Sequence, residues 1–407
     1  MDNGSQPLIC EFAKAGIKME IRLRGRLFGR ERPSDIVIRN GVIASIEPSG
    51  RARADIGVKR SILGPTLFDI QVNGACGIDL QSPSLKPEDV FKITDVLASW
   101  GVSCWIPTII TAPADAMEHG CRVIADAMQD PGIARAVPGI HVEGPCISPQ
   151  DGPRGAHARE YVRNPNLKEF DRLQKAARGN IIYITMAPEL DGAVRFIKGV
   201  TARGVKVALG HHNGNAEQIA RAVDAGARLS THLGNGLAST INRHLNPLWP
   251  QLADDRLTAG LIADLQHLPA PVLKTFVRAK RPENVILTSD CVHIAGLPPG
   301  KHKLGGLDVE MLSSGRICLS GTDLLAGSSL MLLQGVINAA ETTDLSLEQA
   351  FASASTVPAR FFGLKRRFTP PKVGAKADLL LFDIERDAQG KVKTIVRSVF
   401  INGYRKV

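Results

Sequence analysis

Short apolar segments alternate with segments of helical periodicity through most of this 407-residue chain. This alternation is typical of a parallel sheet, because each helix returns the chain to the edge where the next strand begins. Eight such strands predict a (β/α)8 barrel. The expected strands are residues 62–70, 102–109, 137–142, 181–185, 205–209, 229–231, 257–262 and 285–289. The expected helices include residues 87–100, 114–127, 167–177, 191–203, 270–280, 325–340 and 346–362.

The two ends of the chain differ in character from the middle. Short apolar runs flank Asn40-Gly41 near the start and precede Asn402-Gly403 near the end, and Asn-Gly is a strong hairpin signal. Because chain termini often lie close together, we expect both ends to build one small β-sandwich domain. Its expected parts are residues 1–61 and 369–407, and the barrel is expected over residues 62–368.

The composition argues against several classes of protein. A net charge of +10 is modest for this length, and aromatic residues make up only 5%, which argues against nucleic-acid binding. We find no apolar run long enough for a membrane span. The seven cysteines are odd in number and form no Cys-x-x-Cys motif. This pattern predicts reduced thiols in a cytoplasmic protein.

Residues 205–236 form the most informative unit of the predicted barrel. An apolar strand ends at His211, and a second short strand ends at His232. Between them, Asn215 and Gln218 have the spacing of a helix-capping box. Adjacent parallel strands bring their carboxyl ends to one edge of the sheet, so we expect the two imidazoles to be neighbours.

Other polar residues follow the remaining strands at the same edge, where barrel enzymes carry their active sites. Glu143 follows the third strand, and with His211 and His232 it makes a two-histidine, one-carboxylate set. This set is typical of catalytic zinc sites that keep one position open for water, and iron(II) accepts the same ligands. Asp290, after the eighth strand, is placed to take a proton from that water.

Structural alternatives exist for each of these residues. Glu143 could form an ion pair with an arginine, and Asp290 could cap the segment that follows it. His141 lies two residues before Glu143, on the same strand face but one layer deeper. We therefore expect His141 to be a packed core histidine.

Eight short motifs occur in a fixed order: Gln71-Val-Asn-Gly74, His141-Val-Glu-Gly-Pro145, Gly155-Ala-His157, Gly210-His211, Thr231-His-Leu-Gly-Asn235, Asp264 to His267, Ser289-Asp290 and Leu325-Ala-Gly-Ser-Ser329. Together they resemble the N-acetylglucosamine-6-phosphate deacetylases of the amidohydrolase superfamily. The resemblance runs from about residue 60 to residue 383. It implies a metal-bearing barrel with a small β-sandwich built from both termini.

The resemblance also implies roles for single residues. Glu143, His211 and His232 would hold one divalent metal ion, which zinc fits best. Asp290 would act first as the general base and then as the acid that protonates the leaving amine. His157 would polarise the acetyl carbonyl. The residues expected to bind the substrate are Gln71, Asn235, Gly236, Arg243, His267, Leu325 and Ala326.

The phosphate group would be held by Asn235, Gly236, Arg243 and His267, where a guanidinium fork matches phosphate oxygens. Many superfamily members carry His-x-His after the first strand for a second metal. Here the two positions are Gln71 and Asn73, and amides are poor zinc ligands beside imidazole. The resemblance therefore implies a single-metal site.

The chain departs from the family pattern at the substrate end. Gly234 stands where an aromatic residue is usual, and His244-Leu-Asn246 replaces Glu-Pro-Gly. Residues 246–255 are also unfamiliar, and a loop insertion at 150–154 precedes His157. The reaction is thus better defined than the exact sugar.

The sequence leads to the hypothesis of a metal-dependent deacetylase acting on N-acetylglucosamine 6-phosphate. An alternative keeps the chemistry but changes the substrate to another N-acetylated amino sugar or a cyclic amide. A catalytically silent sugar-phosphate binder is disfavoured, because no metal ligand or base is missing. The family resemblance implies a homo-oligomer, either a dimer or a tetramer.

Overall fold

The computed structural model describes the chain except residues 1–19, 305–306, 324, 365–367, 389 and 391. The first nineteen residues of the predicted small domain therefore lie outside the described part. Contacts divide the chain into two compact units. One comprises residues 68–96 and 104–358, and the other comprises the remaining described residues.

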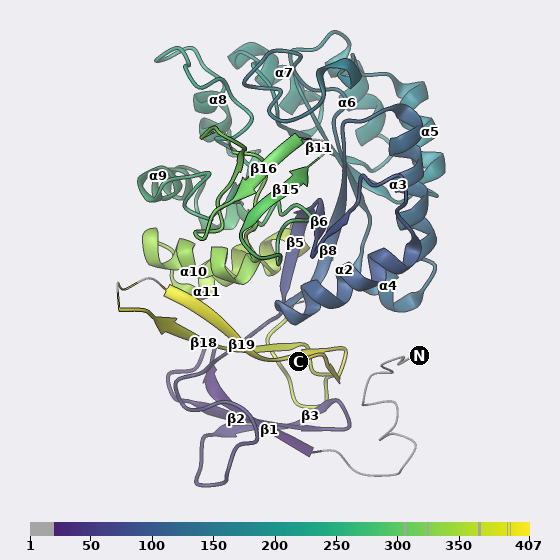
Figure 1. The fold of residues 1–407 in the computed structure, drawn as a ribbon. Coiled ribbons are helices and arrows are strands. Elements are labelled where there is room, and N and C mark those ends of the chain that lie inside the picture. Colours follow the sequence, from purple (N-terminus) through teal and green to yellow (C-terminus); the bar gives the residue numbers. More distant parts are fainter. Residues whose placement is uncertain (1–19, 305–306, 324, 365–367, 389, 391) are drawn as a thin grey trace. The chain divides into compact units, whose positions relative to one another are not determined.

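The first unit contains the predicted barrel, which is confirmed (Figure 1). Eight strands follow one another in chain order around a single sheet, with parallel pairing from β8 to β14. The barrel closes where Val72 pairs with Cys291 in a parallel bridge. The backbone N–H of Asn73 donates to the Cys291 carbonyl there, at 2.8 Å. The strands are β5 (Leu67–Val72), β8 (Val102–Ile110), β9 (Ile140–Glu143), β10 (Ile181–Met186), β11 (Lys206–Leu209), β12 (Ala227–Ser230), β13 (Thr258–Ile262) and β14 (Val285–Thr288).

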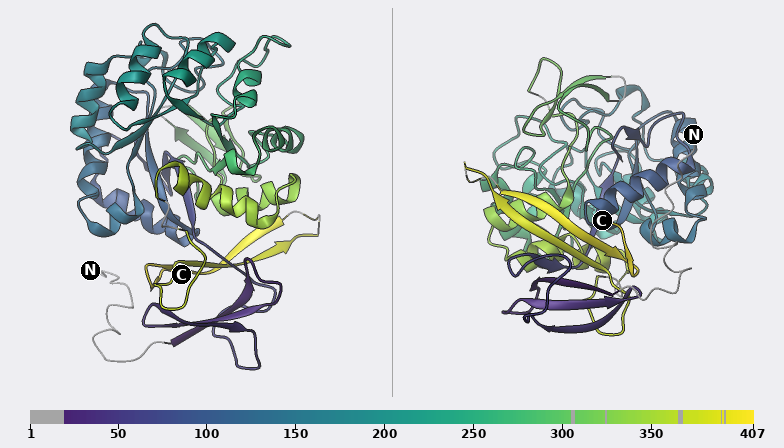
Figure 2. Two further views of the ribbon diagram at one scale, coloured as in Figure 1. Left: turned by 180° about the vertical axis from the view of Figure 1, so that it is seen from behind. Right: turned by 60° about the horizontal axis from the view of Figure 1, so that its bottom comes forward.

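Helices surround these strands on the outside, as the view from behind shows (Figure 2). Their inward faces are apolar, because buried residues recur at helical spacing, as in α3 and α7. The helices are α2 (Pro87–Ser99), α3 (Ala114–Ala127), α4 (Pro131–Ala136), α5 (Leu167–Ala176), α6 (Ala193–Thr201), α7 (Ala216–Ala225), α8 (Leu248–Ala253), α9 (Ala270–Lys280), α10 (Leu332–Thr342), α11 (Leu347–Ser353) and α12 (Thr356–Phe361).

The capping signals around α7 are confirmed. The Gln218 amide N–H donates to Oδ1 of Asn215, and the Asn215 amide N–H donates to Oε1 of Gln218, both at 2.9 Å. Gly226 ends the helix with a φ of 124°, which a glycine adopts without strain. This short helix fixes the spacing between the strands that end at His211 and His232.

Two of the expected helices are wrong at their boundaries. The helix expected from residue 325 begins only at residue 332, because Ser328 instead bridges to Cys291 in an extended conformation. The helix expected over residues 346–362 is divided into α11 and α12. Pro358 accounts for the break, since its ring would clash with the carbonyl of Ala354 in a continuous helix.

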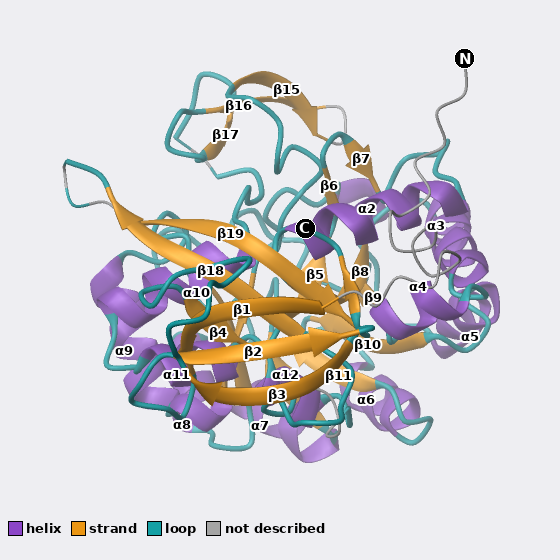
Figure 3. Cartoon of the chain, turned by 90° about the horizontal axis from the view of Figure 1, so that it is seen from below, coloured by secondary structure: helices purple, strands orange, loops and turns teal. Residues whose placement is uncertain are grey.

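The second unit is the small β domain expected from the two ends of the chain (Figure 3). Its seven strands lie in the order β20-β19-β18-β4-β1-β2-β3, around a cluster of buried aliphatic residues with Phe400. The strands are β1 (Glu20–Leu27), β2 (Ser34–Arg39), β3 (Val42–Pro48), β4 (Ile62–Gly64), β18 (Leu379–Arg386), β19 (Val392–Ile401) and β20 (Tyr404–Arg405).

The single strand expected over residues 62–70 is in fact two strands. β4 pairs with β1 and β18 in the small domain, whereas β5 belongs to the barrel. Pro65 lies between them and has no N–H to donate to a sheet, so a continuous strand is interrupted there.

A three-stranded antiparallel sheet was not expected from the sequence. It consists of β15 (Gly300–Leu304), β16 (Leu307–Met311) and β17 (Ile317–Leu319). Its inner side packs on a small buried cluster that includes Ile294 and Ala326. A two-stranded hairpin, β6 (Gly74–Ala75) with β7 (Ile78–Asp79), follows the first barrel strand. Both features extend from the edge of the barrel that carries the polar residues.

Candidate active site

Three of the predicted site residues sit in an unusual backbone conformation at the ends of their strands. His211, His232 and Asp290 have φ values of 52°, 28° and 50°. Residues with a side chain rarely adopt this left-handed region, and such conformations concentrate at functional sites. Each turn ends its strand abruptly and presents the side chain at the carboxyl edge of the barrel.

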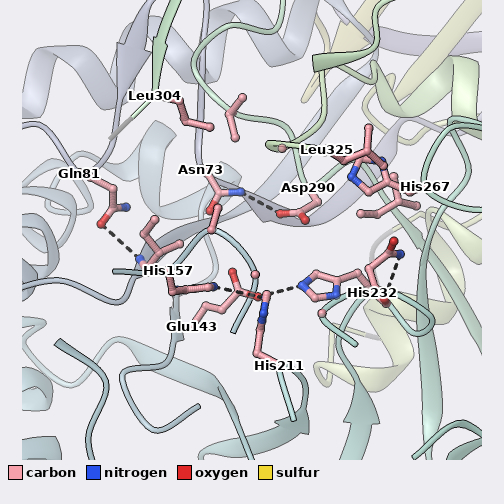
Figure 4. Close-up of a pocket in the computed structure, with 18 of the residues that line it drawn as sticks. Asn73, Gln81, Glu143, His157, His211, His232, His267, Asp290, Leu304 and Leu325 are labelled. Carbon is pink, nitrogen blue, oxygen red and sulfur yellow. Dashed lines mark hydrogen bonds and ion pairs between the residues drawn. The ribbon is translucent and has the colours of Figure 1, made fainter. Parts of the chain in front are cut away.

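The Glu143 carboxylate at the end of β9 joins these strand ends together (Figure 4). Its Oε1 lies 3.3 Å from Nε2 of His211 and 3.1 Å from Nε2 of His232. Its Oε2 accepts a hydrogen bond of 3.0 Å from the side-chain amide of Gln71. Burial alone would raise the pKa of Glu143, but the two histidines hold it well below its usual value. Glu143 is therefore a buried, ionised carboxylate.

His157 completes this cluster from a loop. Its Nε2 lies 3.3 Å from Nε2 of His211, and its Nδ1 lies 2.9 Å from the hydroxyl of Thr111. Burial lowers the pKa of His157 to about 3, so its imidazole is neutral. Within the described residues, Glu143, His157 and His211 form a group whose ligand atoms all lie within 4.8 Å of one another.

The hydrogen bonds of His211 show that the cluster fits a cation. Nδ1 of His211 faces the carbonyl oxygen of Pro153 at 3.0 Å, so this nitrogen carries the proton. The Nε2 atoms of His211 and His232 both face the same carboxylate oxygen of Glu143, so a positive charge, carried by protons or by a metal ion, belongs between these atoms. His232 adds a third ring, and the mixed nitrogen and oxygen donors suit a divalent metal.

Asp290 lies beside this cluster, after the last barrel strand. Its Oδ1 accepts a hydrogen bond of 2.8 Å from the side-chain amide of Asn73. Burial, only partly opposed by His232, raises the pKa of Asp290 to about 7. A carboxyl group with a pKa near neutrality is suited to accept and return a proton.

A cavity of about 250 Å³ opens above these groups. Glu143, His157, His211, His232 and Asp290 all contribute to its wall. The other residues expected from the sequence that line it are Asn235, Gly236, His267 and Leu325.

His267 is held within this wall by Asp264. The Nδ1 of His267 lies 2.7 Å from a carboxylate oxygen of Asp264, and backbone N–H groups of residues 266 and 267 donate to the other oxygen. Although burial would raise it, the pKa of Asp264 is lowered by the bond from His267. His267 is therefore bound through Nδ1, which leaves Nε2 as its second polar atom.

Three of the expected substrate residues are outside the wall of the cavity. Gln71 lies behind it and contacts Glu143. Arg243 is exposed in a loop, and its side chain makes no ion pair with any described residue. Ala326 is fully buried in the cluster beneath β15–β17. The described residues of the wall include no lysine or arginine.

The sequence did not indicate several residues of the wall. Asn73 was singled out only as an amide at the second position of the superfamily's His-x-His pair, without a role in binding or catalysis. Asp79, Gln81 and His293 come from loops and from the β6–β7 hairpin rather than from strand ends. Asn73 lies just after β5, two residues beyond Gln71, so its place at the strand end follows from the sequence.

His141 behaves as the packed histidine that the sequence predicts. It is fully buried, stacks on Tyr183 with ring centroids 3.8 Å apart, and contacts the hydroxyls of Thr108 and Thr185. Both ring nitrogens are thus occupied within the barrel, one layer below Glu143.

A (β/α)8 barrel with a carboxylate and imidazoles gathered at its strand ends is the architecture of a hydrolytic metalloenzyme. Residues 101–405 match the amidohydrolase family, and the chain belongs to it. Within that family it belongs to the N-acetylglucosamine-6-phosphate deacetylases.

Among the described residues, no helix is long and apolar enough to cross a membrane.

Two curated relatives show the extent of the similarity. The N-acetylgalactosamine-6-phosphate deacetylase of Escherichia coli O157:H7 is 32% identical over 85% of this chain and 89% of its own length. The N-acetylglucosamine-6-phosphate deacetylase of Bos taurus is 33% identical over 79% of this chain and 80% of its own.

Solved structures agree with this assignment. An N-acetyl-D-glucosamine-6-phosphate deacetylase from Mycobacterium smegmatis, solved with N-acetyl-D-glucosamine-6-phosphate, superposes with a TM-score of 0.81 and 25% identity, covering 95% of this chain and 99% of its own. The enzyme from Thermotoga maritima has the same fold, with a TM-score of 0.77 over 96% of this chain and 99% of its own, at 24% identity.

Proposed function

We propose that this protein removes the acetyl group from N-acetylglucosamine 6-phosphate, giving glucosamine 6-phosphate and acetate. The observation that carries the proposal is the position of Asp290 beside the Glu143–histidine cluster at the base of one cavity. The names of the relatives supply the substrate class.

In this proposal Glu143, His211 and His232 hold one divalent ion. Their nitrogen and oxygen donors favour zinc, and iron(II) accepts the same set. The Gln71 amide occupies the second oxygen of Glu143, which supports a single-metal site. The bound ion supplies Lewis acidity that makes water nucleophilic near neutral pH.

Asp290 moves the proton. Since Asn73 donates to Oδ1, Oδ2 of Asp290 is the atom that takes a proton from the attacking water. The same atom then returns the proton to the amide nitrogen as the carbon–nitrogen bond breaks. Atoms and charge balance, because the water supplies one oxygen of acetate and both of its hydrogens end on the amine, the first through Asp290 and the second from the newly formed acetic acid.

His157 polarises the acetyl carbonyl. Its Nδ1 lies 2.9 Å from the Thr111 hydroxyl, so Nε2 is the ring nitrogen that faces the histidine cluster, where the carbonyl oxygen would be bound. A donor aimed at the developing negative charge lowers the barrier of the reaction.

Asn235, Gly236 and His267 bind the phosphate end, with Arg243 as an additional cation from its exposed loop. Leu325 packs on the sugar ring, and Ala326 supports it from below. The positions of Asn235, Gly236, His267 and Leu325 in one cavity support this arrangement. His267 is the most suitable donor to phosphate in the wall, because Asp264 holds its Nδ1 and leaves Nε2 as the second polar atom of the ring.

A second candidate substrate is N-acetylgalactosamine 6-phosphate, which differs only in the configuration of one ring hydroxyl. The similarity to the Escherichia coli O157:H7 enzyme favours it, and so do the unusual residues between 234 and 255. The chemistry at Asp290 and the metal would be the same for both sugars.

Acetate release by the zinc-loaded protein tests the proposal. The two N-acetylhexosamine 6-phosphates and unphosphorylated N-acetylglucosamine are assayed side by side. Turnover of a phosphorylated sugar alone is the expected result, and the faster of the two identifies the substrate. A protein that binds one metal ion yet releases no acetate from any of the three would refute the proposal.

The proposal also includes a cytoplasmic homo-oligomer. The six cysteines of the described chain are free, which supports a reducing compartment. Leu245 and Trp249 are 85% and 50% exposed, and large exposed apolar side chains are typical of contact surfaces. Light scattering in solution would give the number of subunits.

A further inference from the structure

One polar side-chain atom of Asn73 has no hydrogen-bond partner among the described residues. The side chain is 9% exposed and lines the cavity next to Asp290 (Figure 4). Its amide nitrogen donates to Oδ1 of Asp290 at 2.8 Å. Its amide oxygen, Oδ1, is buried and has no hydrogen-bond partner among the described residues. A buried acceptor without a donor is costly, so it indicates a missing partner.

The backbone holds Asn73 firmly in this position. Its N–H donates to the Cys291 carbonyl at 2.8 Å, and its carbonyl accepts from the N–H of Leu80 at 3.1 Å. The NH₂ end of the side-chain amide is engaged by Asp290, which leaves the oxygen as the free end. The free oxygen is therefore presented on a rigid support.

Gln81, a half-buried amide of the wall, offers no such atom. The side-chain nitrogen of Gln81 donates to the Thr108 carbonyl at 3.1 Å, and its oxygen accepts from the N–H of Ile110 at 3.2 Å. Both polar atoms of the Gln81 side chain thus bind the end of β8, whereas the side-chain oxygen of Asn73 is available to accept a hydrogen bond from a ligand.

We infer that Oδ1 of Asn73 accepts the amide N–H of the substrate and thereby aims the nitrogen lone pair at Asp290. The inference rests on the proposed deacetylation. Once water has added to the carbonyl, the nitrogen has one hydrogen and one lone pair. Holding the hydrogen on Asn73 leaves the lone pair facing the carboxyl group that Asn73 itself orients. The proton moves from Asp290 to nitrogen, and the carbon–nitrogen bond breaks. Asn73 is then a catalytic residue that contacts the substrate.

A comparison of an amide with an ester tests this contact. The ester analogue carries a 2-O-acetyl group on glucose 6-phosphate and has no N–H to donate. Asn73→Ala should slow the amide substrate roughly five- to thirtyfold more than the ester, the range expected for one hydrogen bond that leaves a buried donor unpaired. Asn73→Asp retains an acceptor oxygen, so its amide-to-ester ratio should stay closer to that of the wild type.

Equal losses on the amide and the ester would overturn the inference, because they would mean that Asn73 only orients Asp290. Bound metal and the thermal unfolding of both variants are measured in parallel, so that a folding defect is recognised. A wild-type protein that does not release acetate from the amide would instead refute the proposed function itself.

Discussion

The side-chain amide of Gln71 donates to one carboxylate oxygen of Glu143 at 3.0 Å, while the other oxygen of Glu143 faces two imidazoles. Gln71 therefore determines which oxygen of Glu143 is available to a metal ion. A hydrogen bond of this kind orients a ligand without contacting the ion itself.

Replacing Gln71 by methionine should weaken zinc binding roughly ten- to a hundredfold, the usual range for loss of an orienting partner. The thioether has a similar shape but cannot donate to Glu143. Competition with a chromogenic chelator measures the affinity. Unchanged affinity would mean that the histidines alone orient the carboxylate.

Asp290→Asn should retain one metal ion per subunit and lose roughly a hundred- to ten-thousandfold in kcat, because the amide cannot move a proton. Metal analysis and acetate release on the same sample separate the two effects. A rate near that of the wild type would remove Asp290 from the mechanism.

His267→Gln should raise KM for the phosphorylated sugar roughly tenfold, with a smaller change in kcat, since a charged hydrogen bond to phosphate is lost. Arg243→Ala should have the weaker effect, because Arg243 is outside the cavity wall. Steady-state kinetics on the phosphorylated and unphosphorylated sugars give KM and kcat for each variant. An unchanged preference for phosphate in the two variants would place the phosphate elsewhere.

Gly236→Ala should disturb the metal cluster through a steric effect. A Cβ atom at Gly236 would lie 2.9 Å from Nδ1 of His211, and the backbone there has a φ of 60°. We expect at least a tenfold loss of metal affinity. Gly179→Ala is the matched control, because its φ is 83° but nothing lies within 4 Å of the added atom. If both variants lose affinity equally, backbone strain rather than the clash is responsible.

Asp35 in the small β domain links stability to pH. Both of its carboxylate oxygens accept hydrogen bonds of 2.7 Å from Arg24, which lowers the pKa of this buried carboxyl group. The folded state therefore binds this proton less readily than the unfolded state does. The stabilisation is complete above the unfolded pKa of about 3.9 and is lost as the pH falls through the lower folded value.

Asp35→Ala should accordingly lower the free energy of unfolding of this domain by roughly 3–5 kcal/mol near neutral pH, since Arg24 loses its buried partner. The difference from the wild type should shrink below about pH 4. Urea unfolding at several pH values measures it. A difference that is constant with pH would show that lost packing, not charge, is the cause.

The barrel could be predicted because each buried strand is a short apolar run and each helix has a clear inward face. The sheet β15–β17 was missed because its strands are only three to five residues long and β15 contains a single apolar side chain, Leu304. The helix α8 was also missed, because Pro247 and Pro250 argue against a helix in that segment.

The residues of the site also include some that the sequence predicts and some that it does not. Glu143, His211 and His232 could be brought together from sequence because parallel strands deliver their ends to one edge. Asp79 comes from the short β6–β7 hairpin and His293 from a loop, and no periodicity along the sequence records their paths. The positions of Arg243 and Ala326 relative to the cavity likewise depend on loop conformation rather than on spacing along the chain.

The seam where the first and last barrel strands meet has a consequence for the order of assembly. Asn73 and Asp290 are 217 positions apart and are joined only across that seam. During synthesis the proton-transfer pair cannot exist until the eighth strand has left the ribosome and docked. A partly made chain can fold helices and strands, and even gather Glu143 with its histidines, without catalytic competence. Catalytic activity therefore appears only after the barrel has closed. In a refolding experiment, the recovery of activity should lag behind the recovery of helix content.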